Sequence, residues 1–159
     1  LSYGYAITTY VGQNLGAKKY RRIRNGVRSG VYMALITSIV ISGVMVITGR
    51  NILSLFVSGE AGQVKQVLDI AYKYLFIMAI FLWVLYLLYV YRSAIQGLGN
   101  TLIPLASGVV EFCMRVGVAL LLPKLIGEDG IFYAEISAWS GAAILLIVSY
   151  VVIIRKYKE

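Results

Sequence analysis

Residues 12–28 read GQNLGAKKYRRIRNGVR and lie between two long apolar stretches. The segment contains no acidic residue, but it holds six of the chain's fifteen basic residues: Lys18, Lys19, Arg21, Arg22, Arg24 and Arg28. A basic cluster between two membrane-length apolar segments is typical of a short cytoplasmic loop in a multi-spanning membrane protein. The segment therefore predicts both the class of this protein and its orientation in the membrane.

The composition of the whole chain also favours a membrane protein. Charged residues make up 14% of the chain, whereas soluble domains average about 25%. The net charge of +8 would suggest nucleic-acid binding in a soluble protein. Here the basic residues stand at the ends of apolar stretches, so we interpret them as groups that orient the chain in the bilayer. We predict no nucleic-acid partner.

Residues that usually carry enzyme or metal chemistry are scarce in this sequence. There is no histidine, and the single cysteine, Cys113, lies in an apolar stretch. Neither a zinc site nor an intrachain disulfide can be built from these residues. The sequence also contains no phosphate-binding loop, nucleophile triad or metal cluster. We therefore expect no enzyme activity, no cofactor and no metal site.

Apolar stretches of membrane-spanning length recur along the chain. About 20 apolar residues cross the hydrocarbon core as a helix. Five helices are predicted, the first truncated and the fourth ended by Pro123: residues 1–15, 27–48, 71–95, 102–122 and 131–154. The pattern of residues 64–75, VKQVLDIAYKYL, favours an amphipathic helix start at the membrane interface. Because the chain opens with Leu1 inside an apolar stretch, we expect the C-terminal fragment of a larger all-α membrane protein.

Basic residues at the ends of these segments predict the topology. Ten lie on the side of the opening loop: the six named above, Arg92, Arg155, Lys156 and Lys158. Four lie on the opposite side: Arg50, Lys65, Lys73 and Lys124. The positive-inside rule then places the first loop and the C-terminus in the cytoplasm. The two sides alternate consistently through all five segments.

Charged residues inside the 102–122 segment are candidates for function, since charges are costly in a bilayer. Glu111 and Arg115 are four residues apart, so they share a helical face and can form an ion pair. The same face carries Pro104, Ser107 and Gly108, and it must contact other helices or a wet cavity. The pair either lines or gates a translocation cavity, or it is a structural pair that holds the helix against its neighbours.

A second polar face is predicted on the 71–95 segment and the residue that follows it. This face is formed by Tyr86, Tyr89, Ser93 and Gln96, with Arg92 at its margin. Tyrosines inside a span offer hydroxyls and ring faces to cationic or aromatic ligands, which predicts a cavity lining. The alternative is an aromatic belt at the cytoplasmic interface. Near the outer end of the last segment, Glu135 is expected to snorkel or to cap the helix.

Several glycines are predicted to serve packing and turns. Gly12 and Gly16 form a small-xxx-small pair, and so do Gly26 and Gly30. Such pairs let helix backbones approach closely. Residues 96–100, QGLGN, predict a tight cytoplasmic turn.

The sequences of the two predicted cytoplasmic turns resemble those of one family of membrane transporters. Residues 11–30, VGQNLGAKKYRRIRNGVRSG, are similar to the signature after the eighth helix of the multidrug and toxic compound extrusion (MATE) family. Residues 92–123, RSAIQGLGNTLIPLASGVVEFCMRVGVALLLP, resemble that family's tenth-to-eleventh helix region. Residues 131–159 resemble its twelfth helix and tail. The resemblance covers essentially the whole chain, in order.

This resemblance implies the C-terminal half of a twelve-helix transporter. Members of the family have two six-helix bundles around a cavity that opens alternately to the two sides of the membrane. They export cationic or amphiphilic drugs in exchange for Na⁺ or H⁺, which implies a coupling ion for the full-length protein. The implied setting is the bacterial cytoplasmic (inner) membrane. The implied partners are membrane lipid, small cationic or amphiphilic substrates, and a missing N-terminal lobe, without which this fragment should not transport.

The resemblance also assigns individual residues. Glu111 and Arg115 match an E-x-x-x-R element of many bacterial members, whereas residues 71–95 lack an acid that could support a Na⁺ site on helix ten. The turn motifs, whose implied role is structural or conformational, are matched by Gly12, Gln13, Gly16, Ala17, Gln96, Gly97 and Gly99. Two other functions stay open. A lipid-linked saccharide flippase of the same superfamily would need several inward-facing arginines, and a non-transporting scaffold would show no polar cavity.

Overall fold

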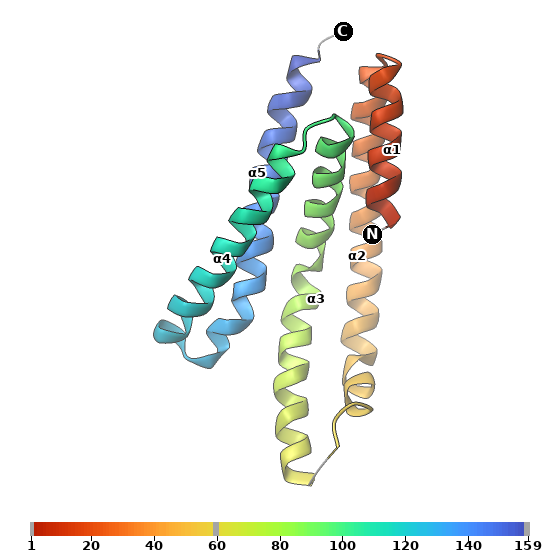
Figure 1. Ribbon diagram of the computed structural model, residues 1–159. Coiled ribbons are helices and arrows are strands. Elements are labelled where there is room, and N and C mark those ends of the chain that lie inside the picture. The colour runs from red at the N-terminus through yellow and green to blue at the C-terminus, as the bar shows by residue number, and fades with distance from the viewer. Residues whose placement is uncertain (1, 59–60, 158–159) are drawn as a thin grey trace.

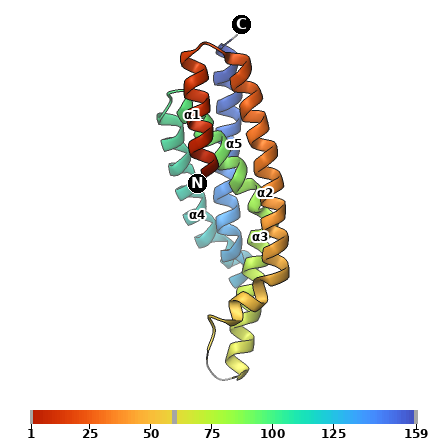
Figure 2. The same ribbon diagram turned by 90° about the vertical axis from the view of Figure 1, so that its right-hand side faces the viewer.

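The computed structural model describes residues 2–58 and 61–157, and the regular elements in these residues are all helices. In chain order they are α1 (Ser2–Gly16), α2 (Tyr20–Ser54), α3 (Ala61–Gly97), α4 (Leu102–Ile126), the 3₁₀ helix η1 (Glu128–Ile131) and α5 (Phe132–Lys156). Successive helices run up and down the bundle, and the α1–α2 turn lies at the same end as the C-terminus (Figure 1). Figure 2 shows the bundle edge-on, with α2 and α3 extending beyond the other helices at the opposite end.

Four of these helices are long and apolar enough to cross a membrane. The candidate spans are Tyr20–Ser54, Gly62–Gly97, Leu102–Ile126 and Asp129–Lys156. Large apolar side chains cover their outer faces, among them Ile36, Ile47, Leu105, Leu120 and Ile144, each more than half exposed. Helices satisfy their own backbone hydrogen bonds, so such surfaces suit lipid rather than water. The predicted all-α membrane class is confirmed.

The second and third helices are longer than the apolar stretches that predicted them. α2 begins at Tyr20 rather than near residue 27, and α3 begins at Ala61 rather than near residue 71. Residues 64–75 lie in the first turns of α3, as the predicted helix start requires, and their place at a membrane interface stays a prediction. At 1.5 Å per residue, α2 and α3 extend roughly 50 to 55 Å, well beyond the ~30 Å hydrocarbon core. Hydropathy marks only the part of a helix that lies in lipid, which explains the difference.

The fourth helix does not end at Pro123, as the sequence predicted, but continues to Ile126. A proline has no backbone N–H to donate, but its carbonyl can still accept a hydrogen bond, so a helix can continue for one more turn after it. Here the Gly127 amide donates to the Pro123 carbonyl at 2.9 Å. The chain then turns back so closely on α4 that a Cβ on Gly130 would lie 2.7 Å from the Pro123 nitrogen. A glycine is needed at that position.

The centre of the bundle is α3, on which α1, α2 and α5 pack, while α4 packs mainly on α5. The largest fully buried side chains come from several helices and include Val11, Ile23, Leu88, Ile95 and Leu146. Glycines allow α1 to approach its neighbours. A Cβ on Gly26 would lie 2.1 Å from a ring carbon of Tyr10, and one on Gly97 would lie 2.7 Å from the Cβ of Val11.

Both turns at the C-terminal end of the bundle use the same backbone motif. Lys18 after α1 and Gly99 after α3 adopt the left-handed conformation, with φ of +56° and +82°. In each turn the amide of the next residue donates to the carbonyl five residues back, at 2.9 Å and 3.2 Å. This Schellman motif satisfies the last carbonyls of a helix. Gly99 adopts it without steric cost, whereas Lys18 carries a Cβ in an unfavourable conformation.

Candidate functional site

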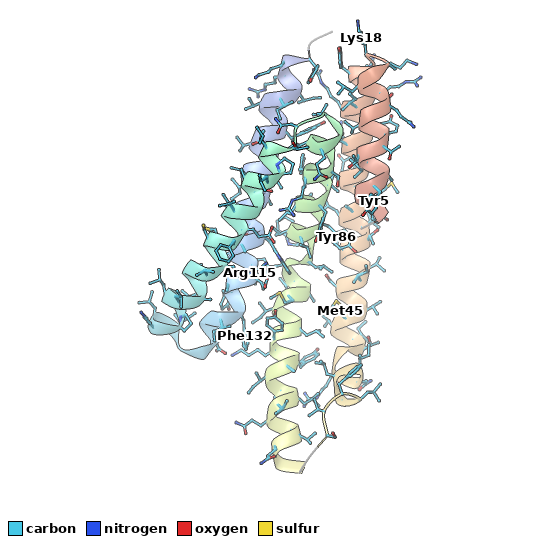
Figure 3. All side chains as sticks on the ribbon, in the orientation of Figure 1. Tyr5, Lys18, Met45, Tyr86, Arg115 and Phe132 are labelled. Atoms are coloured by element: carbon cyan, nitrogen blue, oxygen red, sulfur yellow. The ribbon has the colours of Figure 1, made fainter. Side chains whose placement is uncertain are left out.

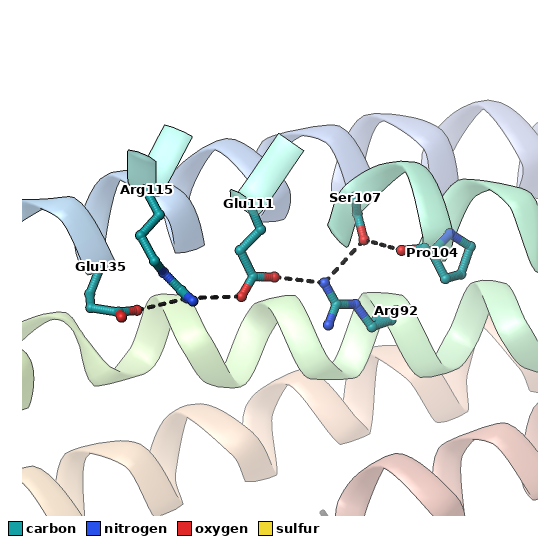
Figure 4. Close-up of polar contacts among 6 residues, drawn as sticks. All are labelled: Arg92, Pro104, Ser107, Glu111, Arg115 and Glu135. Atoms are coloured by element: carbon teal, nitrogen blue, oxygen red, sulfur yellow. Dashed lines mark hydrogen bonds and ion pairs between the residues drawn. The ribbon is translucent and has the colours of Figure 1, made fainter. Parts of the chain in front are cut away.

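Four charged side chains form a continuous row of contacts in the middle of the bundle (Figure 4). Arg92 of α3 donates to Glu111 of α4 at 2.9 Å. Arg115 of α4 contacts the other oxygen of Glu111 at 3.3 Å and Glu135 of α5 at 2.9 Å. We call Arg92, Glu111, Arg115 and Glu135 the charge ladder. Its signs alternate, so its net charge is zero.

The register of two helical hairpins produces this order. α3 and α4 run antiparallel on either side of the turn at residues 98–101, so Arg92 near the end of α3 lies beside the early turns of α4. α4 and α5 are likewise antiparallel around η1, which brings Arg115 beside Glu135. Figure 3 shows Arg115 pointing from α4 toward α3. With a rise of 1.5 Å per residue, Glu111 lies roughly 14 Å along α4, about midway through a bilayer core.

Arg92 and Glu111 are the better shielded half of the charge ladder and are supported by one buried hydroxyl, whereas 43% of the Arg115 side chain is accessible. Glu111 is the least exposed member of the ladder, with 21% of its side chain accessible, and Arg92 follows with 23%. Ser107 is fully buried; its hydroxyl accepts from Arg92 at 3.1 Å and donates to the Pro104 carbonyl at 2.7 Å. Breaking a buried ion pair costs several kcal/mol because a charge is left without compensation. The alternation of signs avoids that cost in the apolar middle of the bundle.

Two donors of the charge ladder are not used by the described residues. The Nε atoms of Arg92 and Arg115 are buried and have no hydrogen-bond partner in the part of the chain that the structure describes. Buried donors of this kind usually have an acceptor. The ladder is thus neutral in charge while retaining capacity for hydrogen bonding.

The predicted polar face of α3 lies beside α1. Tyr86 and Tyr89 line a pocket of about 160 Å³ together with Tyr3 of α1. A second pocket of about 160 Å³ lies one turn further along α3, lined by Gly4, Tyr5, Thr8, Tyr89, Arg92, Ser93 and Gln96. Figure 3 labels Tyr86 and Tyr5 near these pockets. Both pockets are small and lie at the α1–α3 contact.

Individual residues of this face have different surroundings. Ser93 is buried, and its carbonyl accepts from the Thr8 hydroxyl at 3.1 Å. Tyr86 is half-buried, whereas Tyr89 and Gln96 are exposed on the same side of α3. The structure therefore brings the four predicted residues together along α1. Their role as a cavity lining stays a prediction.

Arg92 joins the two polar faces that sequence analysis treated separately. It lines the second pocket with Tyr89 and Gln96, and it also binds Glu111. The expectation that Glu135 caps its helix is wrong, because no described side chain caps the start of α5 and the Glu135 carboxylate pairs with Arg115. Its snorkelling stays a prediction. Reflecting residue numbers about the 98–101 turn pairs Arg92 with Ser107, one helical turn before Glu111. No such reflection pairs Arg115 with Glu135, so only the structure brings these two side chains together.

The residues of the turn motifs divide into two groups. Gly97 packs against α1 and Gly99 forms the turn, as described above. By contrast, Gly12, Gln13, Gly16 and Ala17 are exposed on one end of α1. A Cβ on Gly16 would meet no described side chain within 4 Å. The structural role predicted for this exposed group stays a prediction.

The charge ladder is not a metal site of the usual kind. Among the described residues, no group of three or more His, Cys, Asp or Glu side chains could hold a metal ion. The carboxylates of Glu111 and Glu135 are already in contact with arginines. The coupling ion implied by the family resemblance therefore stays a prediction.

Comparison with known protein families gives one match. The family model MatE matches residues 1–121, which include both turn motifs and three members of the charge ladder. Glu135 lies outside the matched range. No individual curated protein matches the chain.

Proposed function

Since the chain belongs to the MatE family of membrane transporters, we propose that it forms the C-terminal lobe of a cation-coupled antiporter. In this proposal the antiporter exports drugs and other xenobiotics in exchange for Na⁺ or H⁺. The observation that carries the proposal is the continuous polar surface that Arg92 creates between the α3 face and the charge ladder. Membrane helices rarely expose such a surface to lipid.

The proposed substrate contacts lie on the face of α3. Ring faces and hydroxyls of Tyr86 and Tyr89 attract cationic amphiphiles through cation–π contacts and hydrogen bonds. Tyr89 and Gln96 are exposed, so they are available to a cavity completed by an N-terminal lobe. The positive charge of Arg92 would repel a cation if Glu111 did not neutralise it.

The proposed role of the charge ladder is to hold three helices as one unit. Glu111 links α4 to α3 through Arg92, and Arg115 links α4 to α5 through Glu135. A lobe held in this way can rock as a rigid body between two orientations, which alternating access requires. Neutralising Glu111 would leave two arginines competing for one remaining carboxylate, and the link to α3 would weaken.

The proposed orientation places the α1–α2 turn and the C-terminus in the cytoplasm of a bacterial cell. Figure 3 labels Lys18 at this end. Two of the four basic residues at the opposite end are neutralised: Arg50 pairs with Asp69 at 2.7 Å and Lys73 pairs with Asp129 at 2.5 Å. The six basic residues of the opening loop have no such ion pair among the described residues. That asymmetry of free positive charge supports the positive-inside assignment.

Replacing Glu111 tests this function. We expect Glu111→Gln in the full-length protein to abolish most drug resistance of a sensitive host strain at unchanged membrane abundance. The double variant Glu111→Gln/Arg115→Gln restores a neutral charge balance and serves as the matched control. Because the double variant lacks the links from α4 to both α3 and α5, it should stay inactive. Recovery of resistance in the double variant would show that transport needs only a balanced charge, and it would contradict the proposed role of the ladder.

The two rival functions fit the site less well. A flippase for a pyrophosphate-linked saccharide needs free arginines, but Arg92 and Arg115 are both engaged by carboxylates. A non-transporting scaffold does not need the polar pockets beside α1. We therefore retain drug export as the proposal.

A further inference from the structure

A basic pocket lies near the cytoplasmic end of the bundle, between α2, α3 and α5. Its volume is about 250 Å³, and its lining consists of Arg24, Val27, Arg28, Val31, Tyr32, Tyr91 and Tyr150. Both α2 and α5 pack on α3 but make few contacts with one another, so the pocket lies where these two helices separate. We call it the α2–α5 pocket.

The α2–α5 pocket is distinct from the site proposed for transport. Tyr91 lines this pocket, whereas Tyr89 lines the pockets beside α1. Two residues on a helix are separated by about 200° around its axis, so these tyrosines point to opposite sides of α3. The α2–α5 pocket is lined by no residue of α1.

The pocket carries two positive charges that the described residues do not compensate. Arg24 donates to the Tyr157 carbonyl at 2.9 Å and to the Ile154 carbonyl at 3.4 Å. Arg28 donates to the Tyr32 hydroxyl at 3.2 Å and lies over that ring, 5.6 Å from its centroid. All of these acceptors are neutral. Within residues 2–58 and 61–157, no carboxylate forms an ion pair with either arginine.

A buried hydroxyl in the same pocket lacks an acceptor. Tyr150 is 8% exposed, and its hydroxyl has no hydrogen-bond partner among the described residues. Its ring packs edge-on against Tyr91, with centroids 5.4 Å apart. A buried polar group without a partner is costly, so a donor retained beside two arginines indicates an acceptor that comes from outside the chain.

We propose that the α2–α5 pocket binds the phosphate of an anionic phospholipid headgroup in the cytoplasmic leaflet. Arginine and tyrosine donors match phosphate oxygens, and basic pockets between membrane helices on this side favour anionic lipids. Arg24 and Arg28 follow the start of α2 by only one to two turns, the depth of lipid headgroups.

Surfaces for the acyl chains adjoin the pocket. On α2, Tyr32 lines the pocket and is 53% exposed, and Ile39, 68% exposed, lies two turns further along the same face. The Tyr150 hydroxyl is covered, so binding includes a small side-chain movement at the rim of the pocket. The Arg28 side chain is suited to such a movement, because it is exposed and, within residues 2–58 and 61–157, forms hydrogen bonds only with Tyr32.

Lipid retention by the full-length protein tests this proposal. Native mass spectrometry in detergent would compare bound phosphatidylglycerol with phosphatidylcholine, which has the same acyl chains and a neutral headgroup. We expect selective retention of phosphatidylglycerol. Arg28→Gln should weaken it about fivefold, the effect of one interfacial charge. Tyr150→Phe should weaken it about threefold, through one hydrogen bond, without removing any contact within the protein.

A matched control is Arg21→Gln, which removes one charge from the first turn of α2 outside the pocket. It should leave phosphatidylglycerol retention nearly unchanged. Equal retention of the two lipids, or an equal loss in Arg21→Gln and Arg28→Gln, would overturn the proposal. So would displacement of the lipid by inorganic phosphate alone, which would indicate a free-anion site. Because no transport is measured, the result is independent of the function proposed above.

Discussion

Two pairs of arginines in this bundle have opposite surroundings. Arg92 and Arg115, in the middle of the bundle, each contact a carboxylate at 2.9 Å. Arg24 and Arg28, near the end of the bundle that holds the α1–α2 turn, contact only backbone carbonyls and a tyrosine hydroxyl among the described residues. The residue type is the same, and the difference lies in what each guanidinium faces, because Tyr91, the neighbour of Arg92 on α3, lines one pocket with Arg24 and Arg28.

This difference follows from the cost of a charge in each setting: the Arg92 side chain is 23% exposed, whereas Arg24 and Arg28 are exposed. In the hydrocarbon core a charge without a partner is strongly unfavourable, so the protein itself must supply a counter-ion. At the headgroup level, water and anionic lipid can supply it. We therefore propose that the central arginines hold the helices together and that the peripheral arginines are available to partners outside the chain. Three substitutions test this comparison.

The largest effect is expected when the central carboxylate is removed. Glu111→Leu leaves Arg92 and Arg115 with Glu135 as their only acid in the charge ladder, so the free energy of unfolding should fall by about 3 kcal/mol. Thermal unfolding of the purified protein in detergent would measure this loss. Arg28→Gln, which also changes one charge but lies at the headgroup level, is the control and should change stability little. Similar losses in the two variants would contradict the comparison.

A moderate effect is expected at Arg24, whose side chain joins the start of α2 to the end of α5. Arg24→Gln removes donors to the Tyr157 and Ile154 carbonyls, and with them a cation at a helix C-terminus. We expect a loss of about 1 kcal/mol, confined to that end of the bundle. Hydrogen exchange of the last turn of α5 should become faster, while exchange in α4 stays unchanged. Faster exchange throughout the bundle would argue against a local role.

The smallest effect should have the opposite sign. Lys18→Gly removes a basic residue of the opening loop but relieves its left-handed backbone, so stability should rise by about 0.5 to 1 kcal/mol. Gly99→Ala is the matched control at the equivalent turn position and should lower stability by a similar amount. Thermal unfolding of the two variants gives both values. Loss of stability in Lys18→Gly would show that this charge has a structural role.

Much of the architecture could be predicted from the sequence. Apolar stretches located four helices of membrane-spanning length, because burial in lipid depends on composition along a single segment. Helix ends were less accurate, since α2, α3 and α4 continue beyond their apolar parts. The Glu111–Arg115 contact was also predicted, because the spacing of residues within one helix determines it.

The partners of that pair could not be obtained in the same way. Whether Arg92 reaches Glu111, and Glu135 reaches Arg115, depends on the register between neighbouring helices. The unpaired hydroxyl of Tyr150 likewise depends on how α2, α3 and α5 separate.

The sequence by itself determined the membrane class, the family resemblance and the basic loop, because each depends on residues close together along the chain. Only the tertiary structure decided which basic residues are neutralised and which remain free. Packing between helices places a charge either beside a carboxylate or beside neutral oxygens. For this protein, that placement separates the arginines of the charge ladder from those of the α2–α5 pocket.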